Sequence, residues 1–235
     1  MRAGSVIRTD TDQAAQTLSI SQFEPVESVE HSPLALRWRR FGDFTLATVG
    51  YVVAALPMLV IAALVKLTSK GPVLFTQERI GRDGVPFQVL KFRSMADGTH
   101  TDVLSSETER REYIENDFKL DPSDKRITPL GKFLRKTSLD ELPQLINIIK
   151  GDMSLVGIRP LVPLELGMRP SYDQDLYRSL RPGLTGLWQV EGRSAIEKVE
   201  RYALDRRYIE TWSPWNDVKI LVRTPFALLR VHHTQ

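Results

Sequence analysis

The longest uncharged stretch of this chain, FTLATVGYVVAALPMLVIAALV, runs from Phe44 to Val65 and comprises 22 residues. The hydrocarbon core of a bilayer requires about 20 residues of α-helix to cross it. A helix that is apolar on every side also lacks the polar face by which a surface helix of a soluble protein meets water. The sequence therefore predicts a membrane-anchoring helix within residues 34–70.

Positive charge flanks this run on both sides, because it is preceded by Arg37, Arg39 and Arg40 and followed by Lys66 and Lys70. Lys and Arg flanks stay in the cytoplasm, so neither orientation of a single span is favoured. Pro57 lies near the middle, where it removes a helical hydrogen bond and favours a kink. These residues leave two topologies open: a helix broken at Pro57 that returns to the same membrane face, or a single span with a tolerated proline.

The rest of the chain indicates an α/β protein that is mostly helical. Residues 1–33 are rich in Ser, Thr, Gln, Asp and Glu, and we expect a disordered polar tail there. In the remaining domain, residues 71–235, the segments 73–77 and 86–92 read as strands, and the turn signal Gly81–Gly84 between them predicts a hairpin. Ser213 and Pro214 start a predicted amphipathic helix with Trp212 and Trp215, which belongs either to the core or to the lipid interface.

Two adjacent carboxylates, Asp140 and Glu141, stand where a further helix is predicted to begin. Asp140 as N-cap places Pro143 in the first turn, where its missing N–H costs nothing. Ser138 with Glu141 as a capping box is the alternative. A helix start keeps a carboxylate ionised and attracts phosphate. Capping alone also accounts for acidic residues at this position.

Several cations are candidates for binding phosphate. Lys91 and Arg93 alternate with Phe92, so they share one face of a strand end, although a solvated face is the ordinary reading. The other candidates are Arg135, just before the carboxylate pair, and Arg159, Arg181 and Arg193 in glycine-punctuated turns. Neither a P-loop nor a dinucleotide-binding glycine pattern occurs. The chain has no Cys, four His and a pI of about 9.1, which disfavours thiolate and histidine sites and suits an anionic partner.

Three runs occur in order: KFRSM (91–95), LRKTSLDELPQLINIIKGDMSLVG (134–157) and RPGLTGLWQVEGR (181–193). Over roughly residues 36 to 230 the chain resembles the bacterial sugar transferases, which are polyprenyl-phosphate glycosyl-1-phosphate transferases. It is most similar to the small monotopic members that start exopolysaccharide units. It departs from their pattern at Ile158, where they have proline in GPRP, and at Leu56, where they often have serine before the proline.

The resemblance implies transfer of a sugar 1-phosphate from a UDP-sugar to polyprenyl (undecaprenyl) phosphate, with release of UMP. It makes Asp140 the nucleophile that forms a phosphosugar intermediate and Glu141 the partner acid that helps to hold Mg²⁺. The phosphate-binding candidates remain those named above: Lys91, Arg93, Arg135, Arg159, Arg181 and Arg193.

The resemblance also favours the re-entrant topology, with the catalytic domain on the cytoplasmic face of a bacterial inner membrane. Membrane lipid is then a partner, nucleic acid is not, and a homo-oligomer is compatible. A catalytically inactive membrane scaffold of a polysaccharide assembly complex is the alternative, but it has no need of Asp140 and Glu141 together with the cations. A nucleic-acid binder leaves the run from Phe44 to Val65 unexplained.

Overall fold

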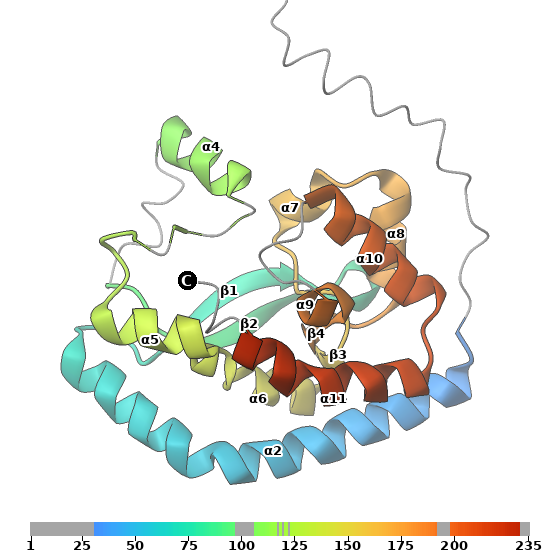
Figure 1. The fold of residues 1–235 in the computed structure, drawn as a ribbon, viewed down its shortest axis with the longest axis horizontal. Coiled ribbons are helices and arrows are strands. Elements are labelled where there is room, and N and C mark those ends of the chain that lie inside the picture. The colour runs from blue at the N-terminus through green and yellow to red at the C-terminus, as the bar shows by residue number, and fades with distance from the viewer. Residues whose placement is uncertain are drawn as a thin grey trace, which may run out of the picture.

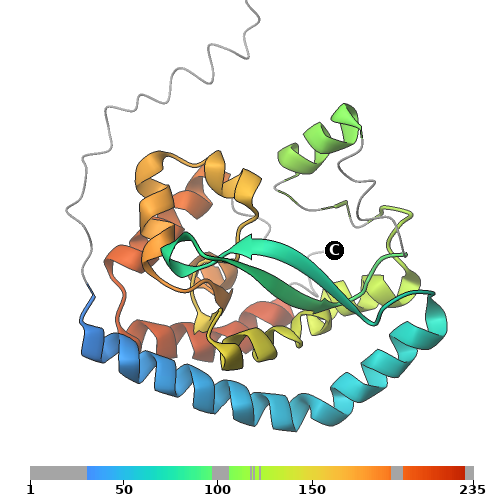
Figure 2. The same ribbon diagram turned by 180° about the vertical axis from the view of Figure 1, so that it is seen from behind.

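The computed structural model describes residues 31–96, 106–116, 118, 120–121, 123–191 and 198–230. Helices dominate, and a small antiparallel hairpin crosses the middle of the molecule (Figures 1 and 2). The helices are α2 (Pro33–Thr68), α4 (Glu107–Glu115), α5 (Pro129–Thr137), α6 (Gln144–Lys150), α7 (Pro163–Gly167), α8 (Ser171–Ser179), α9 (Leu187–Glu191), α10 (Lys198–Glu210) and α11 (Pro214–Arg230), with short 3₁₀ turns η2 (Arg82–Gly84) and η3 (Leu139–Glu141). The strands are β1 (Leu74–Ile80), β2 (Pro86–Phe92), β3 (Ser154–Val156) and β4 (Gly183–Thr185).

The predicted membrane helix is present as α2, but the predicted break in it is not. The helix continues through Pro57 and bends as one element along an edge of the domain (Figure 1). Pro33 stands in its first turn, where a fixed φ favours helix and no N–H is needed. The helix therefore begins inside the stretch predicted to be a disordered tail, and residues 1–30 of that tail lie outside the described residues.

The outer side of α2 exposes large apolar side chains. Val53, Leu56 and Leu59 are 75%, 71% and 69% exposed, whereas Ile61 and Val65 are buried against the domain. In the part of the chain that the structure describes, α2 is the one helix that is long and apolar enough to cross a bilayer. Only 11% of the residues in its most apolar stretch are buried. An exposed apolar surface of this kind is typical of a membrane or protein interaction site.

Polar contacts fix the N-terminal part of α2 to the domain. The Arg40 guanidinium donates two hydrogen bonds of 2.6 Å to the carbonyls of Ile148 and Ile149 in the last turn of α6. The buried Asp43 carboxylate accepts two hydrogen bonds at the start of β3. One comes from the Ser154 hydroxyl (2.6 Å) and the other from the backbone N–H of the next residue (3.0 Å). This end of α2 is thus part of the folded domain.

We expect Asp43→Ala to lower the free energy of unfolding by about 2–3 kcal/mol, because it leaves a buried N–H and a buried hydroxyl without their acceptor. Thermal unfolding in detergent measures the change. Thr45→Ala is the matched control, since the exposed Thr45 hydroxyl bonds only within its own helix. Equal midpoints for the two variants would show that Asp43 does not anchor α2.

The predicted hairpin is confirmed. β1 and β2 pair antiparallel in a register that sets Leu74 opposite Phe92 and Ile80 opposite Pro86. A second pair was not predicted: β3 and β4 run parallel, with Val156 opposite Thr185. A backbone bridge between Ile80 and Leu161 joins the end of the hairpin to the segment after β3.

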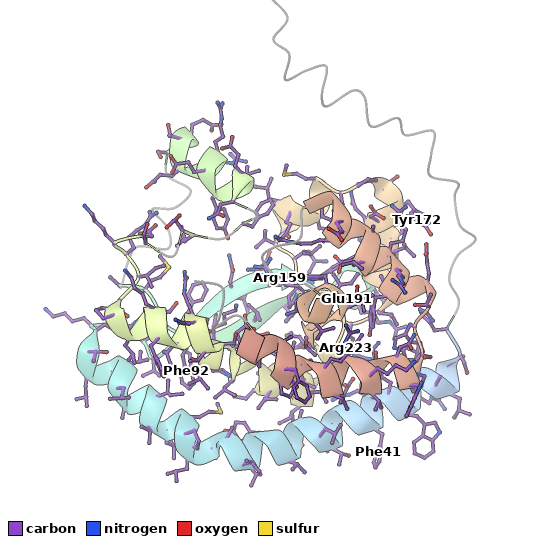
Figure 3. All side chains as sticks on the ribbon, viewed as in Figure 1. Phe41, Phe92, Arg159, Tyr172, Glu191 and Arg223 are labelled. Carbon is purple, nitrogen blue, oxygen red and sulfur yellow. The ribbon has the colours of Figure 1, made fainter. Side chains whose placement is uncertain are left out.

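Helices α8 to α11 surround the main core, in which Tyr177, Tyr208 and Ile209 are buried. Helix α11 begins at Pro214, as predicted, with Ser213 as its cap. Its outer side carries exposed residues at helical spacing, namely Trp215, Val218, Val222 and Phe226. Helix α11 approaches α9 through Arg223 and Glu191, 3.6 Å apart (Figure 3). Phe41 projects from the outer side of α2, whereas Phe92 packs between α2 and α5 (Figure 3).

Candidate active site

The carboxylate pair lies in a tight turn between two helices, and this differs from the prediction. Helix α5 ends at Thr137, its C-cap Ser138 has a left-handed φ of 58°, and Asp140 and Glu141 then lie in η3. Pro143 has no N–H to donate to the Leu139 carbonyl, as an α-helix would require. The Leu142 N–H donates to that carbonyl instead, which closes the three-residue turn of a 3₁₀ helix. Asp140 is therefore not the N-cap of α6, which begins after Pro143.

The charge of the pair is consequently balanced by side chains rather than by a helix start. Asp140 is only 7% exposed. Burial raises its pKa to about 6, and the Glu141 charge adds to this effect, while Lys91 and Arg135 oppose it. A carboxylate with this pKa stays largely ionised at neutral pH and is poorly solvated, which favours nucleophilic attack.

Lys91 contacts the second member of the pair. Its Nζ lies 2.7 Å from Glu141 Oε1, and the two side chains are 24% and 31% exposed. Strand β2 therefore presents a cation directly beside the η3 turn. This position agrees with the predicted role of Lys91 near a phosphate, which stays a prediction.

Arg135 reaches the pair from the last turn of α5. It interacts electrostatically with Asp140, and its Nε donates a hydrogen bond of 2.9 Å to the Ser94 hydroxyl. Partial burial lowers its pKa, but the guanidinium remains charged at any physiological pH. The site thus holds two cations, Lys91 and Arg135, around two carboxylates.

Arg93 lies on the same strand end but points elsewhere. Its guanidinium is buried, and Nη2 donates hydrogen bonds of 2.8 Å to both the carbonyl and the hydroxyl of Ser69, the C-cap of α2. This contact joins the C-terminal end of α2 to the strand that carries Lys91. Binding of phosphate by Arg93 stays a prediction.

Among the described residues, the arginines of the glycine-punctuated turns contact groups other than the carboxylate pair. Arg159 follows β3 and lies 3.8 Å from the buried Glu165 carboxylate. Arg181 Nε donates a hydrogen bond of 2.7 Å to the carbonyl of Gly151. Gly151 is the C-cap of α6, at the opposite end of that helix from Asp140. Arg193 lies outside the described residues. Their roles in phosphate binding also stay predictions.

Two residues of this region were missed in the sequence. Ser94 belongs to the KFRSM run, but alternation along the strand places it on the face opposite Lys91 and Arg93, so it was not grouped with them. Glu165 carried no sequence signal, because its partner Arg159 comes from a loop whose path depends on β3.

The donor set at the pair suits Mg²⁺ as a partner of a bound phosphate. Magnesium usually takes one or two protein carboxylates and fills its other positions with water and substrate phosphate oxygens. Asp140 and Glu141 supply two adjacent carboxylates whose mutual repulsion a cation relieves. No cluster of three or more His, Cys, Asp or Glu occurs among the residues that the structure describes, so a site built wholly of protein ligands is not seen there.

Residues 34–231 match the family model "Bacterial sugar transferase". The chain is 41% identical over 203 residues to "Undecaprenyl-phosphate galactose phosphotransferase" of Salmonella typhimurium, covering 84% of this chain and 42% of that protein. It is 37% identical over 224 residues to "Exopolysaccharide production protein ExoY" of Rhizobium meliloti, covering 90% and 94% of the two chains. It is 45% identical over 186 residues to "UDP-glucose:undecaprenyl-phosphate glucose-1-phosphate transferase" of Caulobacter vibrioides, covering 74% and 63%.

Several relatives are longer proteins, of which this chain spans about two fifths. The family match nevertheless extends from the start of α2 to the end of α11, and so includes both the apolar helix and the carboxylate pair. The chain therefore belongs to the bacterial sugar transferase family.

Proposed function

We propose that this protein transfers a sugar 1-phosphate from a UDP-sugar to polyprenyl phosphate and releases UMP, the first membrane step of exopolysaccharide or glycoconjugate synthesis. The observation that carries the proposal is the buried Asp140 next to Glu141, with Lys91 and Arg135 at the same turn. The names of the Salmonella and Caulobacter relatives, an undecaprenyl-phosphate galactose phosphotransferase and a glucose-1-phosphate transferase, support the same chemistry.

In the first step, an Asp140 carboxylate oxygen attacks the phosphorus that carries the sugar. An oxygen–phosphorus bond to Asp140 forms while the bond from that phosphorus to the bridging oxygen breaks, and UMP leaves with the bridging electron pair. Lys91 and Arg135 stabilise the charge that grows on the phosphate oxygens.

In the second step, an oxygen of polyprenyl phosphate attacks the same phosphorus. The acyl phosphate bond breaks, the Asp140 carboxylate is restored, and the product is a polyprenyl diphosphate sugar. Glu141 with Asp140 would hold Mg²⁺, which supplies charge neutralisation between the carboxylate and the diphosphate.

The bend of α2 and the anchoring of both its ends to one domain support a re-entrant topology in which the helix bends but does not break at Pro57 (Figure 1). The Lys and Arg flanks at both ends favour the cytoplasmic face of the inner membrane for this domain. Arg40 bonds the N-terminal part of α2 to the domain, and Ser69 at the C-terminal end is held by Arg93. A straight span would carry these two ends to opposite faces, about 30 Å apart. The exposed apolar stripe of α11 suits the lipid interface next to it.

Cysteine labelling tests this topology, because the chain has no Cys of its own. Arg37→Cys and Lys70→Cys place one thiol at each exposed flank of α2. We expect a membrane-impermeant maleimide to label both thiols only after inverted vesicles are made or cells are opened. Labelling of one position from the periplasm and the other from the cytoplasm would establish a single span.

A UMP-release panel tests the proposed activity. The purified protein in nanodiscs is given polyprenyl phosphate, Mg²⁺ and, in turn, UDP-glucose, UDP-galactose and their N-acetyl relatives. We expect one or more donors to release UMP in a reaction that EDTA stops. Absence of turnover with every donor would favour the inactive scaffold of an assembly complex.

Lys91→Met is expected to lower kcat by roughly ten- to a hundredfold, which corresponds to about 1.4–2.8 kcal/mol of lost stabilisation. The change removes the cation beside Glu141. Lys132→Met is the matched control, since Lys132 is exposed on α5 and its loss should leave kcat near the unaltered value. Similar kcat values for the two variants would remove Lys91 from the site.

A further inference from the structure

Ser94 touches one of the two cations of the site. Its hydroxyl accepts a hydrogen bond of 2.9 Å from Arg135 Nε, and Ser94 is only 8% exposed. Arg135 in turn acts electrostatically on Asp140. Arg135 therefore links Ser94 to Asp140, the carboxylate proposed to attack phosphorus.

The backbone independently holds α5 against Ser94. The N–H of Thr128, just before α5 begins, donates a hydrogen bond of 3.1 Å to the Ser94 carbonyl. A Cβ on Gly131 would lie 1.9 Å from that carbonyl oxygen, so only glycine allows this approach. An antiparallel bridge pairs the neighbouring residues Met95 and Ile127. The place of α5 therefore does not depend on the Ser94 side chain. Among the described residues, the hydrogen-bond partner of the Ser94 hydroxyl is Arg135.

The nitrogen through which Ser94 holds Arg135 determines which edge of the guanidinium can bind an anion. Arginine presents five N–H donors in a planar fork, and its two terminal nitrogens bind two oxygens of a phosphate side by side. A hydrogen bond at Nε leaves that terminal edge for an anion and restricts the rotation of a long side chain. A bond at a terminal nitrogen would instead occupy the edge that an anion requires.

We propose that Ser94 is a positioning residue for the transfer reaction: its hydroxyl holds Arg135 by Nε, so that the two terminal nitrogens face the phosphate on which charge develops. The inference rests on the proposed function. It assigns a role in catalysis to a neutral side chain that touches neither the substrate nor the carboxylate pair.

A double-mutant cycle tests it. We expect Ser94→Ala to lower kcat about tenfold, with less than about a twofold change in KM for the UDP-sugar, because the lost interaction serves the transition state. Arg135→Lys removes the Nε–H donor and retains the charge. In that background Ser94→Ala should have no further effect. An equal loss in both backgrounds, or no loss in either, would overturn the inference.

A second measurement does not depend on activity. The Arg135 Nε–H resonance, identified by its absence in Arg135→Lys, should exchange slowly with water in the unaltered protein and quickly in Ser94→Ala. Fast exchange in the unaltered protein would overturn the positioning role. Ser179→Ala is the control, because the Ser179 hydroxyl bonds only within α8 and its loss should change neither readout. Failure of every UDP-sugar to yield UMP would reject the proposed function while this exchange still reports on the Ser94–Arg135 contact.

Discussion

Asp140→Asn is expected to lower UMP release by about a thousandfold or more, as loss of a covalent nucleophile does. Asparagine has nearly the same shape but offers no anionic oxygen for attack on phosphorus. With a donor labelled in the sugar-linked phosphate and no acceptor, the unaltered protein should also retain label on the chain, and the variant should not. Label on the variant, or turnover above about one hundredth, would show that another group attacks.

The same variant should be more stable, which separates a catalytic effect from misfolding. Burial and the Glu141 charge raise the pKa of Asp140 to about 6 from its ordinary value of 3.8. The folded state therefore binds this proton more tightly than the unfolded state, and ionisation costs stability as the pH rises from about 4 to about 6. Above that range the cost is complete, at about 1–3 kcal/mol, and Asn does not incur it.

Thermal unfolding in EDTA measures this gain. At pH 8 the midpoint of Asp140→Asn should lie a few degrees above that of the unaltered protein, at roughly 2–4 °C per kcal/mol for a chain of this size. The difference should shrink at pH 5, where the native carboxylate is protonated. A lower midpoint at both pH values would mean that Asp140 stabilises the fold.

Gly183→Ala should produce a large loss of stability. Strands β3 and β4 approach so closely that a Cβ on Gly183 would lie 2.1 Å from the Gly157 backbone nitrogen. Real Cβ atoms do not approach backbone this closely, and neither strand can move without breaking the parallel pair. We expect a loss of about 4 kcal/mol or more, near the upper end of single-substitution effects, with poor yield of folded protein.

Gly167→Ala is the matched control, because a Cβ there meets nothing within 4 Å. Its unfolding midpoint should stay within a few degrees of the unaltered value. A tolerated Gly183→Ala would contradict the close strand approach. The same geometry explains the glycines at these turns: the structure uses them for backbone contact between strands, whereas the sequence alone also allowed an anion-binding turn.

Features that depend on neighbouring residues were predictable. The uncharged run ending at Val65 implies a helix in any apolar solvent, and glycines between two β-rich segments imply a hairpin. Pro214 marked a helix start because proline favours the first helical turn. The adjacency of Asp140 and Glu141 is itself a property of the sequence, and it does not depend on the turn that holds them.

Features that depend on distant partners were not predictable. Three-residue strands such as β3 and β4 have no periodicity of their own, so their parallel pairing appears only when the chain is folded. The same holds for the directions of the cations: Lys91 meets Glu141, Arg93 caps α2, and the role of Arg135 depends on the Ser94 hydroxyl.

The sequence by itself determined that this chain has an apolar helix, a hairpin and a carboxylate pair, because local composition and spacing specify each of them. Only the tertiary structure decided that the pair sits in a 3₁₀ turn, buried and balanced by Lys91 and Arg135. It also decided that both ends of α2 bond to one domain. The physical reason is that burial and charge compensation arise from residues far apart in the chain, whose contacts no local pattern encodes.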